Sequence, residues 1–193
     1  MRTPRPPSHY VIVLSIRPAS LPADASAIEA IDTSFTTNTV YEVTAAPQQI
    51  TLRAKKLAEP LTKRFPLEDL RSSTRAYTEA WVALSGATIV GFAAAALETW
   101  NRRLVLWHFY VDPSVRRQGA GRRLLEAVTS YGVTQGARHI WLETSSLNVP
   151  GAEAYRALGF SLTGADLTLY DGTPAEGEVA LFYSRRLDAR PLL

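Results

Sequence analysis

The chain contains no cysteine, and it has no apolar run of the roughly 18 residues that a membrane-spanning helix needs. The lack of cysteine excludes disulfides, thiolate metal ligands and a thiol nucleophile. Histidine is also scarce. His9, His108 and His139 show no spacing typical of metal ligands, so we expect no metal site. The apolar stretch 91–97 is too short to cross a membrane and indicates a buried strand.

Composition is otherwise ordinary for a globular protein. Of 193 residues, 46% are hydrophobic and 20% are charged, which favours one domain with a full core. Residues 1–9 carry arginine and prolines but no apolar segment. We interpret them as a flexible tail and not as a signal peptide, with a single domain over 10–193. These features together predict a cytoplasmic protein.

The net charge is +3, and nearly all the positive charge is arginine. The lysines are Lys55, Lys56 and Lys63. Arginine suits bidentate contacts with phosphate. No long basic stripe with interleaved aromatics is present, so we expect neither a nucleic-acid partner nor a membrane partner.

Hydrophobic periodicity predicts alternating strands and helices. We expect strands over 10–17, 40–43, 50–55, 80–84, 89–98, 103–111, 139–143, 160–169 and 179–185, and helices over 23–33, 118–136 and 151–158. Residues 34–39 read as irregular and 56–75 as a mobile loop. Leu124, Leu125, Val128 and Val133 give the second helix its apolar face. Strands 103–111 and 139–143 flank that helix, so they should be parallel neighbours in a mixed α/β sheet.

The most informative stretch lies between strand 103–111 and the helix that follows it. It reads Arg116-x-x-Gly119-x-Gly121, after a turn at Asp112-Pro113. Glycines let backbone N–H groups approach an anion, and a helix N-terminus adds free N–H donors and a positive dipole end. The loop lacks the spacing of a P-loop or of a dinucleotide fingerprint. An ordinary glycine turn before a surface helix is the alternative interpretation.

A second motif follows strand 139–143. It contains Asn148, Tyr155, Gly159 and Phe160, in the order N-x-x-G-x-x-x-Y-x-x-x-G-F. With the loop motif it resembles the GNAT superfamily of N-acetyltransferases, whose pattern usually has alanine where Gly151 stands. The resemblance is best over 89–160. It implies the GNAT fold: a central, mostly antiparallel twisted sheet with two splayed parallel strands, flanked by helices.

A narrower resemblance extends over nearly the whole chain. The segments 32–43, 100–104, 139–144 and 169–178 resemble the streptothricin (nourseothricin) acetyltransferases. It implies that 34–43 shapes the acceptor pocket. One departure stands out, because that group carries carboxylates on the strand before the loop. This chain has Trp107, His108, Phe109 and Tyr110 there instead.

The resemblance implies acetyl-CoA as co-substrate, bound between the splayed strands. The backbone of Phe109, Tyr110 and Val111 would pair with the pantetheine amides, and an N–H there would polarise the thioester carbonyl. Asn148 would hydrogen-bond the cofactor arm. The pyrophosphate would lie on the loop residues Arg116, Arg117, Gln118, Gly119, Ala120, Gly121 and Arg122.

Acetyl transfer to an amine needs a base for the ammonium and an acid for the departing thiolate. Tyr155 matches the family's general acid, and the resemblance also implies that it contacts the cofactor; a half-buried core tyrosine is the alternative. His108 and Glu143 are the candidate bases, and each has a packing or structural role as its alternative. Water is the remaining candidate.

Four residues are candidates for the acceptor pocket: Glu42, Glu98, Trp107 and Tyr170. Aromatic side chains on strand 103–111 would offer a cation–π wall, although strand aromatics are more often core. The sequence therefore predicts an acetyl-CoA-dependent N-acetyltransferase for a primary amine of a small molecule, with streptothricin as the first candidate and direct transfer in a ternary complex. The alternatives are a peptide N-terminus or a polyamine as acceptor, or a non-catalytic acyl-CoA-binding regulator. A homodimer stays open.

Overall fold

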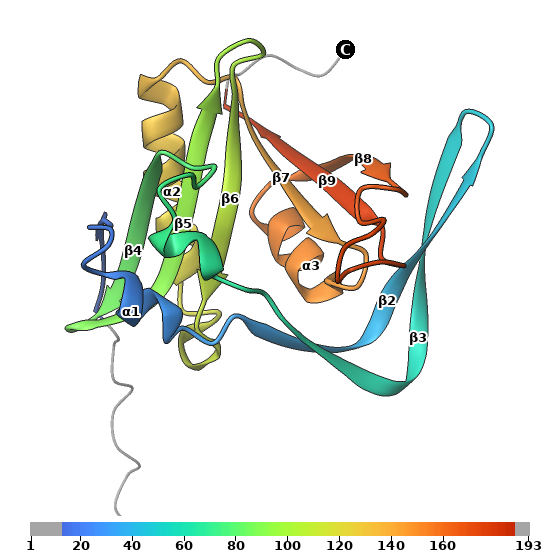
Figure 1. Ribbon diagram of the computed structural model, residues 1–193, viewed down its shortest axis with the longest axis horizontal. Coiled ribbons are helices and arrows are strands. Elements are labelled where there is room, and N and C mark those ends of the chain that lie inside the picture. Colours follow the sequence, from blue (N-terminus) through green and yellow to red (C-terminus); the bar gives the residue numbers. More distant parts are fainter. Residues whose placement is uncertain (1–12, 188–193) are drawn as a thin grey trace, which may run out of the picture.

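The computed structural model describes residues 13–187, so the expected tail at 1–9 lies outside the described residues. A seven-stranded sheet runs in the order β1-β4-β5-β6-β7-β9-β8 (Figure 1). Its strands are β1 (Leu14–Pro18), β4 (Glu79–Ser85), β5 (Thr88–Glu98), β6 (Arg103–Val111), β7 (His139–Ser145), β8 (Ser161–Asp166) and β9 (Ala180–Arg186). All neighbours are antiparallel except β6 and β7, which are parallel. This confirms the predicted mixed sheet and its parallel pair.

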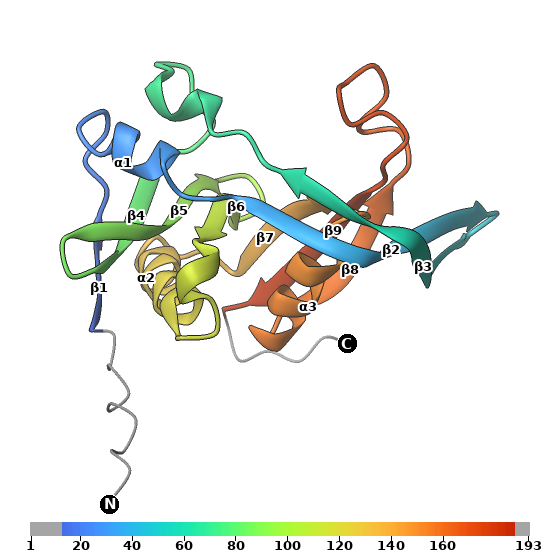
Figure 2. The same ribbon diagram turned by 90° about the horizontal axis from the view of Figure 1, so that it is seen from below.

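Helices cover both faces of the sheet (Figure 2). Helix α2 (Ala120–Thr134) and helix α3 (Val149–Ala157) lie on one face, and the short helix α1 (Ala25–Glu29) lies on the other. The 3-10 turns are η1 (Glu68–Arg71) and η2 (Pro113–Val115).

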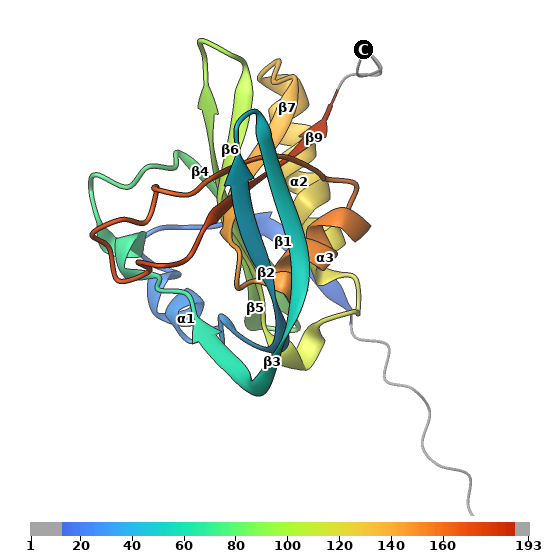
Figure 3. The ribbon, with the colours of Figure 1, turned by 90° about the vertical axis from the view of Figure 1, so that its right-hand side faces the viewer.

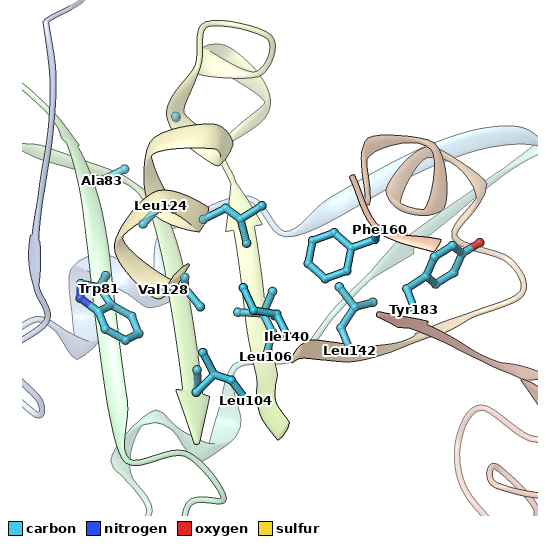
Figure 4. Close-up of a cluster of buried hydrophobic side chains, with 14 of the residues drawn as sticks. Trp81, Ala83, Leu104, Leu106, Leu124, Val128, Ile140, Leu142, Phe160 and Tyr183 are labelled. Atoms are coloured by element: carbon cyan, nitrogen blue, oxygen red, sulfur yellow. The ribbon is translucent and has the colours of Figure 1, made fainter. Parts of the chain in front are cut away.

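The larger core cluster lies between the sheet and helices α2 and α3 (Figure 4). Leu124, Leu125 and Val128 are buried as predicted, because their helical spacing points them at β5 and β6. Val133 is exposed, which differs from the prediction. Gly132 faces the sheet there, where an added Cβ would lie 2.9 Å from a methyl of Leu104.

Residues 34–64 differ most from the sequence prediction. They form a long separate hairpin, β2 (Ser34–Ala46) with β3 (Gln49–Arg64), and β2 packs against α3 (Figure 3). The predicted irregular stretch 34–39 and the first part of the predicted loop 56–75 are therefore strands. Both are polar and partly exposed, so their side chains carry little hydrophobic alternation. The pairing skips 57–60, which is why β3 tolerates Pro60.

Helix α1 is also shorter than the predicted 23–33. The chain turns away after Ile31, and Oδ1 of Asp32 accepts a hydrogen bond from the backbone N–H of Ser34 at 2.9 Å. This Asx-type turn directs the chain into β2 instead of continuing the helix. The start of β2 is thereby brought next to the end of β6, where the backbone N–H of Asp32 donates to Oδ2 of Asp112 at 3.3 Å.

Candidate active site

A cavity opens where β6 and β7 separate. The two strands pair only from Arg103↔His139 to Val105↔Trp141 and then diverge, as Figure 1 shows. The cavity between them has a volume of about 550 Å³. Its wall comes from β2, β6, β7, α2, α3 and the segments after β3 and β8, and includes Phe35, Phe65, Phe109, Glu143, Asn148, Tyr155 and Tyr170. The residues beyond Val105 thus have backbone groups that β7 leaves unpaired.

A β-bulge in β6 sets which side chains enter the cavity. Ala94 pairs with His108, but Ala95 pairs with Leu106, so Trp107 is the extra residue. Trp107, Phe109, Tyr110 and Val111 all line the cavity. Trp107 is 47% exposed.

The predicted phosphate loop begins at Asp112. Its carboxylate accepts the backbone N–H of Ser114 at 3.0 Å and fixes η2. Gly119 has φ +93° and stands at the N-cap of α2, which begins at Ala120. The first-turn N–H groups of α2 have no intrahelical acceptor, so this end of the cavity favours an anion.

Only part of the loop faces the cavity. Arg116, Arg117 and Gly121 line it, whereas Gln118, Gly119, Ala120 and Arg122 do not. The Arg116 guanidinium donates to the backbone oxygen of Val111 at 2.9 Å and to that of Ser34 at 2.7 Å. Arg116 thus joins β6 to the start of β2, a role that its charge alone did not indicate.

Asn148 is buried and caps α3. Its Oδ1 accepts the N–H of Gly151 at 3.0 Å, and its Nδ2 donates to Oγ1 of Thr144 at 2.9 Å. An added Cβ at Gly151 would lie within 2.7 Å of these side-chain atoms. The glycine therefore fits where the family pattern has alanine, since the Asn148 side chain occupies that space.

Tyr155 projects from α3 into the cavity wall. Its ring packs against Phe109, Phe160 and Tyr183, with centroids 6.3, 6.0 and 6.1 Å away. Burial, and then the nearby Glu143 charge, raise the pKa of the Tyr155 phenol above its ordinary value. Tyr155 is therefore a protonated hydrogen-bond donor at neutral pH.

Glu143 lies on β7 in the same wall, and the phenol of Tyr170 donates a hydrogen bond to it. Burial raises the pKa of Glu143, and the hydrogen bond from Tyr170 opposes that rise. A carboxylate with a raised pKa is a better proton acceptor than an exposed one. The structure thus brings together Glu143, Tyr155 and Tyr170.

The structure does not bring His108 into this wall. Its Nε2 lies 2.9 Å from Oδ2 of Asp69 in η1, and its ring packs against Tyr77 and Phe92 with centroids 5.3 and 5.7 Å away. Because Trp107 is the bulge residue, His108 points toward a second, smaller core cluster, which includes Ile28, Tyr77 and Phe92.

Glu42 and Glu98 are also away from the wall. Glu42 lies on β2 and forms an exposed ion pair with Lys55 at 3.0 Å. Glu98 pairs with Arg103, at the end of β6 opposite to the loop. The antiparallel register of β5 and β6 places Glu98 at that end, and local sequence patterns do not determine this register.

The sequence analysis assigned no role at the site to Phe65, Ser145, Lys63 or Glu178. Phe65 lines the cavity and stacks with Phe35 and Tyr110 at 5.7 and 5.9 Å. These rings come from segments far apart in sequence. The mixture of hydrophobic and charged residues at the end of β3 could have indicated a strand that leads Phe65 to the cavity, but this mixture is also typical of a loop.

Comparison with known proteins agrees with this geometry. The profile described as the acetyltransferase (GNAT) family matches residues 46–160. Streptothricin acetyltransferase from Streptomyces lavendulae is 39% identical over 170 residues, 84% of this chain and 90% of that protein.

Solved structures show the same fold. The crystal structure of nourseothricin acetyltransferase superposes with a TM-score of 0.82 at 40% identity, covering 91% of this chain and 99% of the other. A Bacillus anthracis protein in complex with acetyl coenzyme A gives a TM-score of 0.76 at 24% identity, covering 91% and 99%. Among residues 13–187, no helix is long and apolar enough to cross a membrane.

Proposed function

Since the chain belongs to the GNAT family and is an N-acetyltransferase, we propose that it transfers acetyl from acetyl-CoA to a primary amine of streptothricin, directly and in a ternary complex. The relatives named for streptothricin and nourseothricin support this acceptor. The observation that carries the chemistry is one cavity lined both by Arg116, Arg117 and Gly121 of the loop and by Glu143 and Tyr155, which interact electrostatically.

Acetyl-CoA fits the gap between β6 and β7. The backbone of 109–111 is free of β7 and can pair with the amides of the pantetheine arm. Gly121 faces the cavity, where an added Cβ would lie 3.6 Å from the Phe109 ring, so the loop comes close to this strand. Arg116, Arg117 and the first turn of α2 would hold the pyrophosphate. Asn148 acts indirectly, by fixing the start of α3.

Glu143 accepts the proton that the acceptor ammonium must lose before it attacks the thioester carbonyl. A backbone N–H at Tyr110 or Val111 polarises that carbonyl as negative charge develops on its oxygen. The carbon–sulfur bond then breaks as Tyr155 donates its phenolic proton to the thiolate. The second proton that the nitrogen loses on becoming an amide restores the Tyr155 phenol, and Glu143 releases its proton to solvent. Tyr170 holds the Glu143 carboxylate in place. His108, Glu42 and Glu98 take no part in this assignment.

The aromatic residues of β6 support a second class of acceptor. Trp107 and Tyr110 stand in the wall where the streptothricin group carries carboxylates. This aromatic wall favours an amine attached to an apolar body, such as a peptide N-terminus.

The test is release of CoA thiol from acetyl-CoA with streptothricin, polyamines and short peptides offered separately. The proposal expects turnover on streptothricin and a loss of about 10²–10⁴-fold in kcat for Glu143→Gln. Turnover only on a peptide or a polyamine would show that streptothricin is not the acceptor, while leaving the proposed mechanism in place. Wild-type kcat in Glu143→Gln would refute the base.

A further inference from the structure

Three segments meet near Glu143 in a partly buried polar cluster of Lys63, Ser145 and Glu178. Lys63 at the end of β3 forms an ion pair with Glu178, which lies just before β9. The Oγ of Ser145 on β7 also donates to Glu178. The Lys63 and Glu178 side chains are only 23% and 13% exposed, so this pair is largely shielded from water.

Both partners are connected directly to the cavity wall. Ser145 lines the cavity two residues after Glu143, and its Oγ accepts the N–H of Leu147 at 3.0 Å. Phe65 lines it two residues after Lys63, whose Nζ lies 5.7 Å from the centre of the Phe65 ring. The ion pair therefore ties the end of β3 to β7 and to the segment before β9.

The cluster also sets the charge around Glu143. Tyr110 of β6, Tyr155 of α3 and Tyr170 of the segment after β8 all interact electrostatically with Glu143. Lys63 and Glu178 are the fully charged neighbours. The positive charge of Lys63 lowers the pKa of Glu143, and the negative charge of Glu178 raises it.

We propose that Lys63 and Glu178 are positioning residues for acetyl transfer: the pair fixes the end of β3 against β7 and balances the charge beside Glu143. The inference rests on the proposed function, because it takes Glu143 as the proton acceptor. If the ion pair only held the segments together, loss of either partner would shift the pKa of Glu143 in the same direction. If it also balances charge, loss of Lys63 and loss of Glu178 shift that pKa in opposite directions.

The experiment compares the acidic limb of the kcat/KM profile in Lys63→Met, Glu178→Gln and the double variant. Lys63→Met should move this limb to higher pH, because the negative charge of Glu178 then raises the pKa of Glu143 with no positive charge to oppose it. Glu178→Gln should move it to lower pH, and the double variant should return it close to the wild-type position. Each shift should be about one pH unit or less. Lys63→Arg keeps the charge and should keep the wild-type limb.

Lys55→Met is the matched control, since Lys55 forms an exposed ion pair on the same hairpin and should move nothing. Single variants that shift the limb in the same direction, or not at all, would overturn the inference. An acidic limb that persists in Glu143→Gln would instead refute the base assignment. In that case the role in acetyl transfer falls with the base, and titration of the Glu143 carboxyl by 13C NMR decides the charge balance alone: opposite shifts in the two single variants support it, and unchanged or parallel shifts overturn it.

Discussion

Nε2 of His108 lies 2.9 Å from Oδ2 of Asp69, and this contact joins β6 to the turn η1. Only 11% of the His108 side chain is exposed. Since η1 follows Phe65 closely in the chain, the contact anchors the segment that completes the aromatic side of the cavity. These contacts therefore give His108 a packing role, and its role as a candidate base stays a prediction.

Replacing His108 by Gln should reduce stability much more than catalysis. Loss of a hydrogen bond to a charged group costs about 1.5–3 kcal/mol. We expect a lower melting temperature and a kcat reduced less than about tenfold, well below the loss of a general base. Asp69→Asn should give a similar melting temperature. A large loss of kcat together with loss of the acidic limb would return His108 to the list of bases.

Tyr155→Phe should reduce kcat by about 10²-fold or more, because the thiolate would leave without its acid. The ring contacts with Phe109, Phe160 and Tyr183 remain, so the KM for acetyl-CoA should change little. Tyr183→Phe is the matched control: Tyr183 contacts Tyr155 but does not line the cavity. Steady-state kinetics of both variants measure this, and equal losses would argue against the acid role.

Gly119→Ala tests the anion loop. Gly119 has φ +93° with nothing within 4 Å of an added Cβ, so alanine introduces backbone strain of about 1–2 kcal/mol without a clash. Gly86→Ala is matched, since Gly86 has φ +61° and equally open space in the β4–β5 turn. Both variants should lose similar stability, but only Gly119→Ala should raise the KM for acetyl-CoA. An unchanged KM would place the pyrophosphate elsewhere.

Glu143 should make stability depend on pH. Burial raises its pKa above the ordinary 4.5, so the folded protein holds this proton more tightly than the unfolded chain. The contribution of this bound proton to the free energy of unfolding is complete below about pH 4.5, and it is lost as the pH rises through the raised pKa of Glu143. Glu143→Gln removes the cost of the buried charge. The variant should be more stable than wild type near pH 7, and urea titrations should show the difference shrinking at lower pH.

Local chemistry accounts for what could be predicted from the sequence. The spacing of Arg116, Gly119 and Gly121 after a strand predicted the loop and α2, because each feature depends on neighbours within a few residues. The predicted helix 151–158 ends as α3 does, just before Gly159, which has φ +87° and follows the C-cap Leu158. Strands 80–84, 89–98 and 103–111 were confirmed, and the apolar run of β5 is buried continuously over residues 90–96.

The sequence by itself thus determined the sheet, its parallel pair and the loop, all of which follow from periodicity and turn chemistry. Tertiary structure alone decided which side chains meet. The bulge at Trp107 turned His108 away, and burial gave Glu143 its raised pKa. Lys63 and Glu178 are 115 residues apart in the chain. Pairing across that distance depends on how β3 packs against β7 and β9, which no local pattern encodes.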